Sequence, residues 1–138
     1  MQQMVTLNSR PQDAYRRQDV MTASSTDLIV MLYDALKKNM IQGRRGIAQK
    51  NIPAAHKHLI KAQEIVTELV NSLDMNYQIA EELLSIYEFI LSSLEDANLQ
   101  KDPAILEPVI EIVDSLRSAW AEISSSNKGS LYVSEGQA

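Results

Sequence analysis

The sequence predicts an all-α protein that folds as an antiparallel up-down four-helix bundle. Helix breakers are few, with four glycines and four prolines among 138 residues. Apolar residues recur at spacings of three and four along four stretches of similar length, and two stretches begin with a capping residue followed closely by proline. Helices of this kind with short connections pack most simply as an up-down bundle. The length fits one domain with its own apolar core.

The first predicted helix follows a cluster of N-cap residues at 24–27, whose side-chain oxygens accept hydrogen bonds from a first helical turn. Its seam consists of Leu28, Leu32, Ala35, Leu36, Asn39 and Gly43, and a second apolar flank consists of Ile29, Tyr33, Met40 and Ile41. A helix that is apolar on two flanks contacts two neighbours, or one neighbour and a ligand. Gly43 and Gly46 near its end permit close packing or fraying.

The second predicted helix begins at Asn51-Ile52-Pro53, where a proline in the first turn loses no hydrogen bond. Its seam consists of Leu59, Ala62, Val66, Leu69 and Leu73, and it ends at 72–74. The third predicted helix carries Ile79, Leu83, Ile86, Tyr87, Ile90, Leu94 and Ala97 on one face, and it stops at the polar stretch 98–101.

The fourth predicted helix starts at Asp102-Pro103, a second N-cap and proline pair. Its apolar residues are Ile105, Val109, Ile112, Leu116, Ala119, Trp120 and Ile123. Pro108 lies inside this pattern, and an interior proline removes a hydrogen bond and clashes with the preceding turn. We therefore expect either a separate first turn or a helix that begins near Leu106.

The pattern divides the chain into three parts. Residues 1–14 are polar and without periodicity, which predicts a mobile N-terminal arm. Residues 15–124 form the predicted bundle. Residues 125–138 are rich in serine and glycine, which predicts a disordered C-terminal tail.

The charge distribution argues against a nucleic-acid partner. The chain has 18 acidic and 13 basic residues, and the acidic groups are spread over the predicted helices. The basic cluster of Lys37, Lys38, Arg44 and Arg45 lies late in the first helix, where cations interact favourably with the helix dipole.

The sequence also bears on the compartment. It contains no cysteine, which excludes disulfides, thiol nucleophiles and thiolate metal sites. No signal peptide is evident, and the longest aliphatic run, 28–32, is too short to span a bilayer. We expect a cytoplasmic protein without membrane insertion.

No group of residues indicates an enzyme, a cofactor or a metal site. His56 and His58 are two positions apart and point roughly 200° apart on a helix, so they cannot share a metal ion. His58 with Lys61 resembles the histidine phosphotransfer bundle, in which an exposed imidazole beside a lysine is phosphorylated. An ordinary surface histidine is the simpler interpretation, and phosphotransfer through His58 is the alternative function.

The helices carry more apolar residues than a narrow seam requires. Besides the second flank of the first helix, the extra residues are Ile65, Val70, Leu84 and Leu91. They indicate either a wide core or surface grooves that accept amphipathic helices of another chain.

Several segments in order resemble the family of the flagellar secretion chaperone FliS. They are Tyr15, Val20-Met21-Thr22-Ala23-Ser24, Met31-Leu32-Tyr33-Asp34, Ser72-Leu73-Asp74, Ile79-Ala80-Glu81-Glu82-Leu83, Ile86-Tyr87-Glu88-Phe89, Ala97-Asn98 and the stretch from Leu116 to Ile123. The resemblance covers roughly residues 12–123. The chain departs from the family pattern at Gln12, at Ala35 and in the turn 76–78.

The resemblance implies a cytoplasmic export chaperone that binds the disordered C-terminal segment of flagellin, prevents premature polymerisation and docks on the export gate protein FlhA. We assign the implied flagellin-binding groove to Ile29, Leu32, Tyr33, Leu36, Met40, Ile65, Leu69, Tyr87 and Leu91. The arm that docks on the gate or covers the groove is assigned to Tyr15, Val20 and Met21. Coupled folding of the segment would need no nucleotide or metal. A weak homodimer is left open.

Overall fold

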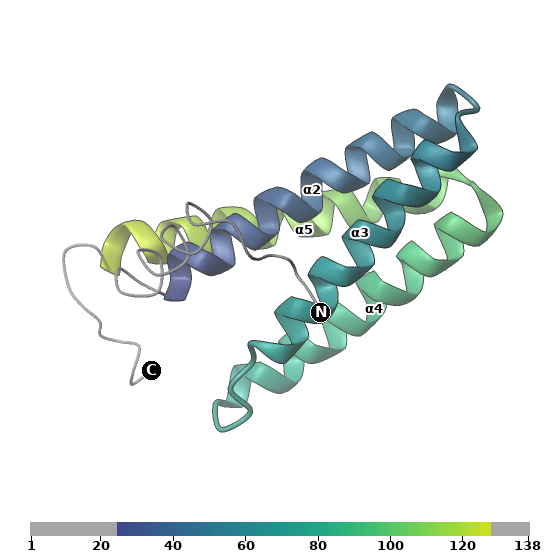
Figure 1. Cartoon of the computed structure of the whole chain (residues 1–138). Coiled ribbons are helices and arrows are strands. Elements are labelled where there is room, and N and C mark those ends of the chain that lie inside the picture. Colours follow the sequence, from purple (N-terminus) through teal and green to yellow (C-terminus); the bar gives the residue numbers. More distant parts are fainter. Residues whose placement is uncertain (1–24, 128–138) are drawn as a thin grey trace, which may run out of the picture.

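The structure, a computed structural model, describes residues 25–127 and consists there of four α-helices (Figure 1). They are α2 (Ser25–Ala48), α3 (Ile52–Asn71), α4 (Gln78–Gln100) and α5 (Pro103–Asn127). Helix α2 packs on α3 and α5, and α4 packs on the same two helices. The helices therefore form a closed ring of neighbours, and the predicted all-α up-down bundle is confirmed.

The bundle is tight at one end and spread at the other. Figure 1 shows all four helices close together near the α2–α3 and α4–α5 connections. Away from that end, the pair α2 and α5 runs in a different direction from the pair α3 and α4. The N-terminal half of α2 and the C-terminal half of α5 consequently diverge from the α3–α4 connection. We call the N-terminal half of α2, the C-terminal half of α3, the N-terminal half of α4 and the C-terminal half of α5 the diverging halves.

The predicted start signals of α3 and α5 act as expected. The Asn51 side chain accepts a hydrogen bond from the Ala54 N–H at 3.2 Å, and Asp102 accepts one from the Ala104 N–H at 3.0 Å. Each carboxamide or carboxylate satisfies an N–H that has no partner within its own helix. The prolines of both first turns lie where no N–H is needed.

Helix α2 ends in a Schellman motif, which turns the chain sharply into α3. The Asn51 N–H donates to the Gly46 carbonyl at 2.8 Å, and the Lys50 N–H donates to the Ile47 carbonyl at 3.0 Å. This geometry requires a left-handed residue between the helices, and Lys50 takes it with φ of 58°. A side chain with a Cβ adopts this conformation at a cost that glycine avoids.

Replacing Lys50 by glycine is expected to stabilise the fold by about 0.5–1 kcal/mol, because the relief of left-handed strain exceeds the extra backbone entropy of glycine in the unfolded chain. The urea midpoint measures this change. Gln49→Gly is the matched control, since Gln49 has an ordinary backbone conformation, and it should leave the midpoint unchanged or lower it. A lower midpoint for Lys50→Gly would contradict the assigned motif.

Two expectations for the last helix are wrong. Helix α5 runs without interruption from Pro103, so there is neither a separate first turn nor a start near Leu106. Pro108 is tolerated because it is exposed, and so is Ala104, whose carbonyl loses its helical partner and can bond water instead. The helix also continues to Asn127. The predicted tail boundary at 125 is therefore too early, and residues 128–138 lie outside the described part.

The core is a single apolar cluster contributed by all four helices. Its fully enclosed aliphatic residues include Leu36, Met40, Leu59, Val66, Leu69, Ile90, Leu94, Leu106, Val109 and Val113. Burial of each large side chain stabilises the fold by roughly 1.5–3 kcal/mol. The predicted seams of the four helices supply most of this set, as their periodicity indicated.

Two glycines allow α2 and α3 to approach closely at the tight end. A Cβ placed on Gly46 would lie 2.9 Å from the Ala55 nitrogen and 3.0 Å from its Cα. A Cβ on Gly43 would lie 2.8 Å from a Leu59 methyl group. Both glycines are buried, and the sequence-based alternative of a frayed helix end does not occur.

Candidate functional site

Most of the nine residues assigned to the groove lie in the core. Six of them are at most 5% exposed: Tyr33, Leu36, Met40, Ile65, Leu69 and Tyr87. In this conformation the six side chains contact other helices of the same chain, so a partner cannot reach them directly. The wide-core interpretation of the second flank of α2 is therefore the better one for Tyr33 and Met40.

The other three assigned residues keep exposed surface. Ile29, Leu32 and Leu91 are partly buried and pack against the core from its margin. Ile29 and Leu32 belong to the diverging half of α2, whereas Leu91 lies in the middle of α4. Of these three residues, Ile29 and Leu32 thus lie on the same helix, and Leu91 lies on another.

The diverging halves carry further apolar side chains that are only partly covered. They include Ile86, Leu116 and Trp120 at the margin of the core, and Met31, Ile79 and Ile123 with larger exposed fractions; Leu73 and Tyr77 of the adjoining α3–α4 connection are also partly exposed. Core residues at the tight end, such as Leu59, Leu94 and Leu106, are 0% exposed. The partly covered residues rest on the core of the diverging halves and leave part of their apolar surface open to solvent. This marginal apolar surface is the candidate binding site.

Two tyrosines form a buried polar contact beneath the candidate site. The hydroxyls of Tyr33 on α2 and Tyr87 on α4 lie 2.6 Å apart, and their rings are tilted with centroids 6.5 Å apart. Burial raises the pKa of both phenols, and the hydrogen bond to Tyr87 raises that of Tyr33 further. The contact therefore links α2 and α4.

Ion pairs connect α2 to α5 along the outside of the bundle. They are Lys37–Asp114 at 2.6 Å, Arg44–Glu107 at 3.0 Å and Arg117–Asp34 at 2.7 Å. These side chains are at least 35% exposed, so solvent screens the pairs and they add little stability. Half of the predicted basic cluster thus has an acidic partner. The dipole interpretation misses this because the partners lie far away in the sequence.

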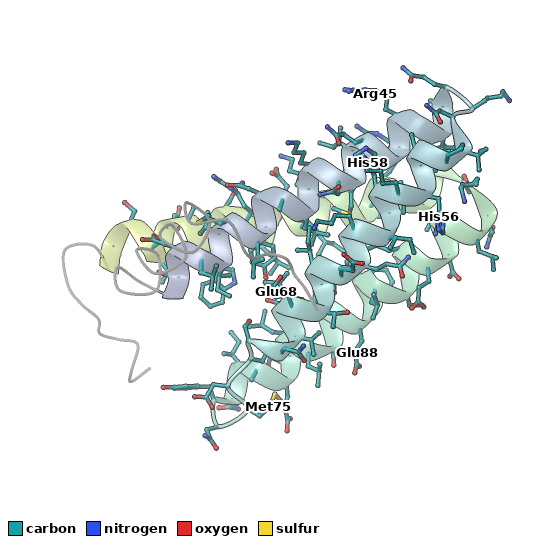
Figure 2. The ribbon with its side chains drawn as sticks, in the orientation of Figure 1. Arg45, His56, His58, Glu68, Met75 and Glu88 are labelled. Atoms are coloured by element: carbon teal, nitrogen blue, oxygen red, sulfur yellow. The ribbon has the colours of Figure 1, made fainter. Side chains whose placement is uncertain are left out.

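The two histidines of α3 face different neighbours, as their spacing predicts (Figure 2). His56 contacts Asn98 of α4 through Nδ1 at 3.0 Å. His58 contacts Asn39 of α2 through Nδ1 at 3.1 Å. Within residues 25–127 no group of three or more histidine or acidic side chains is arranged to hold a metal ion.

Sequence reasoning missed two parts of the candidate site. Trp120 and Leu116 were assigned to the seam of α5, yet both keep exposed surface where α5 leaves α4. Ile79 was assigned to the core face of α4 and is 59% exposed. Helical periodicity identifies which face is apolar, but it carries no information on where the facing helix diverges. The arm residues Tyr15, Val20 and Met21 lie outside the described residues.

Among the described helices, none combines the length and the apolar composition that a membrane crossing requires.

Comparison with known proteins identifies the family. The model of the flagellar protein FliS family matches residues 8–127. A flagellar secretion chaperone FliS of Vibrio cholerae is 35% identical over 103 residues, which cover 73% of this chain and 76% of the relative. The chaperones of the same name from Bacillus subtilis and Salmonella typhimurium are 29% and 32% identical, over 91% and 76% of this chain and 95% and 80% of the relatives. The chain belongs to the FliS family of flagellar secretion chaperones.

Proposed function

We propose that this chain binds the C-terminal segment of flagellin in the bacterial cytosol, prevents its premature polymerisation and delivers it to the export gate protein FlhA. Membership of the family gives the chain a chaperone role in flagellar export, which is not an enzymatic role. The proposal adds the client, its bound segment and its destination.

The observation that supports a client segment is the marginal apolar surface of the diverging halves. Ile29 and Leu32 of α2 and Leu116 and Trp120 of α5 are each partly exposed while resting on the core. An amphipathic helix that covered them would remove apolar surface from water at about 25 cal/mol per Å². Such a segment, disordered when free, would order on binding at a cost of a few kcal/mol.

In this proposal the six buried residues of the predicted groove position the helices and do not contact the client. Tyr33, Leu36 and Tyr87 hold the helices beneath the marginal surface in place. The client would then contact the partly exposed Ile29 and Leu32 of α2 rather than the core itself, and Leu91 of α4 would lie outside this contact. We retain Tyr15, Val20 and Met21 as the proposed gate-docking or covering arm. A weak homodimer through the same apolar surface is a proposal for the empty chaperone.

Mixing the full chain with a flagellin C-terminal peptide is expected to raise helical circular dichroism above the sum of the separate spectra. The double variant Ile29→Ala/Leu32→Ala should weaken peptide binding by about tenfold or more, as loss of central apolar contacts in an interface does. Ile52→Ala/Leu99→Ala is the matched control, because it also removes two exposed aliphatic side chains, 47% and 84% exposed, but at the tight end. Titration calorimetry gives both affinities.

Two outcomes would contradict different parts of the proposal. No gain in helicity with wild-type protein at micromolar concentrations would reject flagellin as the client. Equal weakening by the two double variants, with unfolding midpoints similar to each other, would reject the diverging halves as the site. Delivery is tested separately with the cytoplasmic domain of FlhA, which should bind the peptide-loaded chain more tightly than the empty chain.

A further inference from the structure

The hydrogen bonds around His58 fix which of its ring nitrogens carries the proton. Asn39 Nδ2 donates to the Ala35 carbonyl oxygen at 2.9 Å, and a carbonyl oxygen can only accept. The amide oxygen of Asn39 must therefore face His58, at 3.1 Å from Nδ1. An amide oxygen is an acceptor, so Nδ1 of His58 carries the hydrogen. In the neutral ring, Nε2 then holds a lone pair.

The same argument gives the opposite result for His56. Lys101 Nζ donates to Oδ1 of Asn98 at 2.8 Å, and an ammonium group can only donate. The NH₂ group of Asn98 must therefore face His56, at 3.0 Å from Nδ1. Nδ1 of His56 accepts, so its lone pair is occupied and the hydrogen of the neutral ring lies on Nε2. Two histidines on one helix thus have opposite tautomers.

His58 shares a surface depression with two exposed lysines. His58 lines a surface depression between α2 and α3 together with Asn39, Lys57, Ile60, Lys61 and Glu64. Within the described residues Nε2 of His58 has no hydrogen-bond partner, and neither lysine has an ion-pair partner. Glu64 is the one acidic side chain that lines the depression, and the two lysines outnumber it. The depression therefore combines a nucleophilic nitrogen with cations suited to an oxyanion.

We propose that His58 is a phosphoryl-acceptor site, modified at Nε2 by a phosphoramidate donor. The Nε2 lone pair attacks phosphorus and forms a new N–P bond, and the P–N bond of the donor breaks with its electron pair leaving on ammonia. The Nδ1 hydrogen stays in place, so the product ring is cationic and still donates to Asn39. Lys57 and Lys61 stabilise the charge on the phosphoryl oxygens.

The first experiment labels the folded chain with inorganic phosphoramidate and follows both histidines by ¹⁵N and ³¹P NMR. Before labelling, the ¹⁵N spectrum should show hydrogen on Nδ1 of His58 and on Nε2 of His56. His58 should then be phosphorylated at Nε2 roughly two- to tenfold faster than His56, because His56 must first lose a hydrogen bond of about 0.5–1.5 kcal/mol. In denaturing urea the two rates should become equal.

Variants of the neighbouring asparagines and lysines separate the effect of the tautomer on the labelling rate from the effect of the nearby positive charge. Asn98→Ala should raise the rate at His56 to that at His58, and Asn39→Ala should split the His58 product between Nδ1 and Nε2. Lys57→Gln and Lys61→Gln should each slow labelling of His58, whereas Lys50→Gln, which changes an exposed lysine elsewhere, should not. Equal rates for the two histidines in the native wild-type chain, or hydrogen on Nε2 of neutral His58, would overturn the proposal. Lysine variants without effect would remove the phosphoryl-binding part of it.

Discussion

Substituting Gly46 is expected to destabilise the bundle more than any other change of one small side chain at the α2–α3 contact. Alanine there would place its Cβ 2.9–3.0 Å from backbone atoms of Ala55, which cannot move without moving α3. Overpacking of this kind costs about 1–3 kcal/mol, and the better helix propensity of alanine offsets at most about 1 kcal/mol. We expect a net loss of about 1–2 kcal/mol for alanine and about 3 kcal/mol for valine.

Gly43→Ala is the matched control for Gly46→Ala. Its Cβ would meet the Leu59 side chain, with Cδ2 at 2.8 Å and Cγ at 2.9 Å, rather than backbone, and a side chain can shift by a few tenths of an ångström without moving α3. The gain in helix propensity should then leave a net change of less than about 1 kcal/mol. Chemical denaturation of both variants measures the difference. If Gly43→Ala proves as costly as Gly46→Ala, the distinction between side-chain and backbone contact is wrong.

Removing one hydroxyl of the buried tyrosine pair is expected to cost more than removing both. Tyr87→Phe leaves the Tyr33 hydroxyl without its partner 2.6 Å away in the core, and an unsatisfied buried group costs about 1–3 kcal/mol. The double variant Tyr33→Phe/Tyr87→Phe removes the unsatisfied group as well and should be closer to wild type. A double-mutant cycle from urea denaturation measures this coupling. Additive losses would show that the two hydroxyls do not depend on each other.

The same pair predicts a dependence of stability on alkaline pH. Burial raises the pKa of both phenols in the folded state above the ordinary phenol value of 10.0. Below about pH 10 the folded and the unfolded states both keep the phenol protons, so these tyrosines do not change the free energy of unfolding with pH. Above about pH 10 the unfolded state loses the phenol protons first. The free energy of unfolding then falls by up to about 1.4 kcal/mol per pH unit for each tyrosine. The double phenylalanine variant should show a shallower fall, and an identical fall would contradict the assignment.

The sequence was sufficient for the helices and for most of the core. N-cap residues before a proline located the starts of α3 and α5, and spacings of three and four located the seams. The expectation for Pro108 is wrong because the cost of an interior proline depends on whether the orphaned carbonyl meets water, and exposure is a tertiary property. Lys50 gave no signal at all, because its left-handed backbone conformation is imposed by the turn.

The candidate site was only partly predictable. The apolar excess of α2 was visible in the sequence, but it divides into core residues such as Met40 and marginal residues such as Leu32. The angle between the helix pairs decides whether such a residue is in the core or at its margin. Local periodicity does not encode that angle. The contacts of His56 and His58 were equally hidden, because Asn98 and Asn39 lie 42 and 19 positions away.

The ring of helices has a thermodynamic consequence. The described part of α5 returns to α2, where Ser124 donates a hydrogen bond to Asp27 across 97 positions of sequence. No helix of the bundle is therefore a terminal one that could unfold and leave the other three intact, because each has two neighbours. Loss of any helix exposes apolar surface on both sides of the gap, and this mutual dependence favours all-or-none unfolding of the four helices.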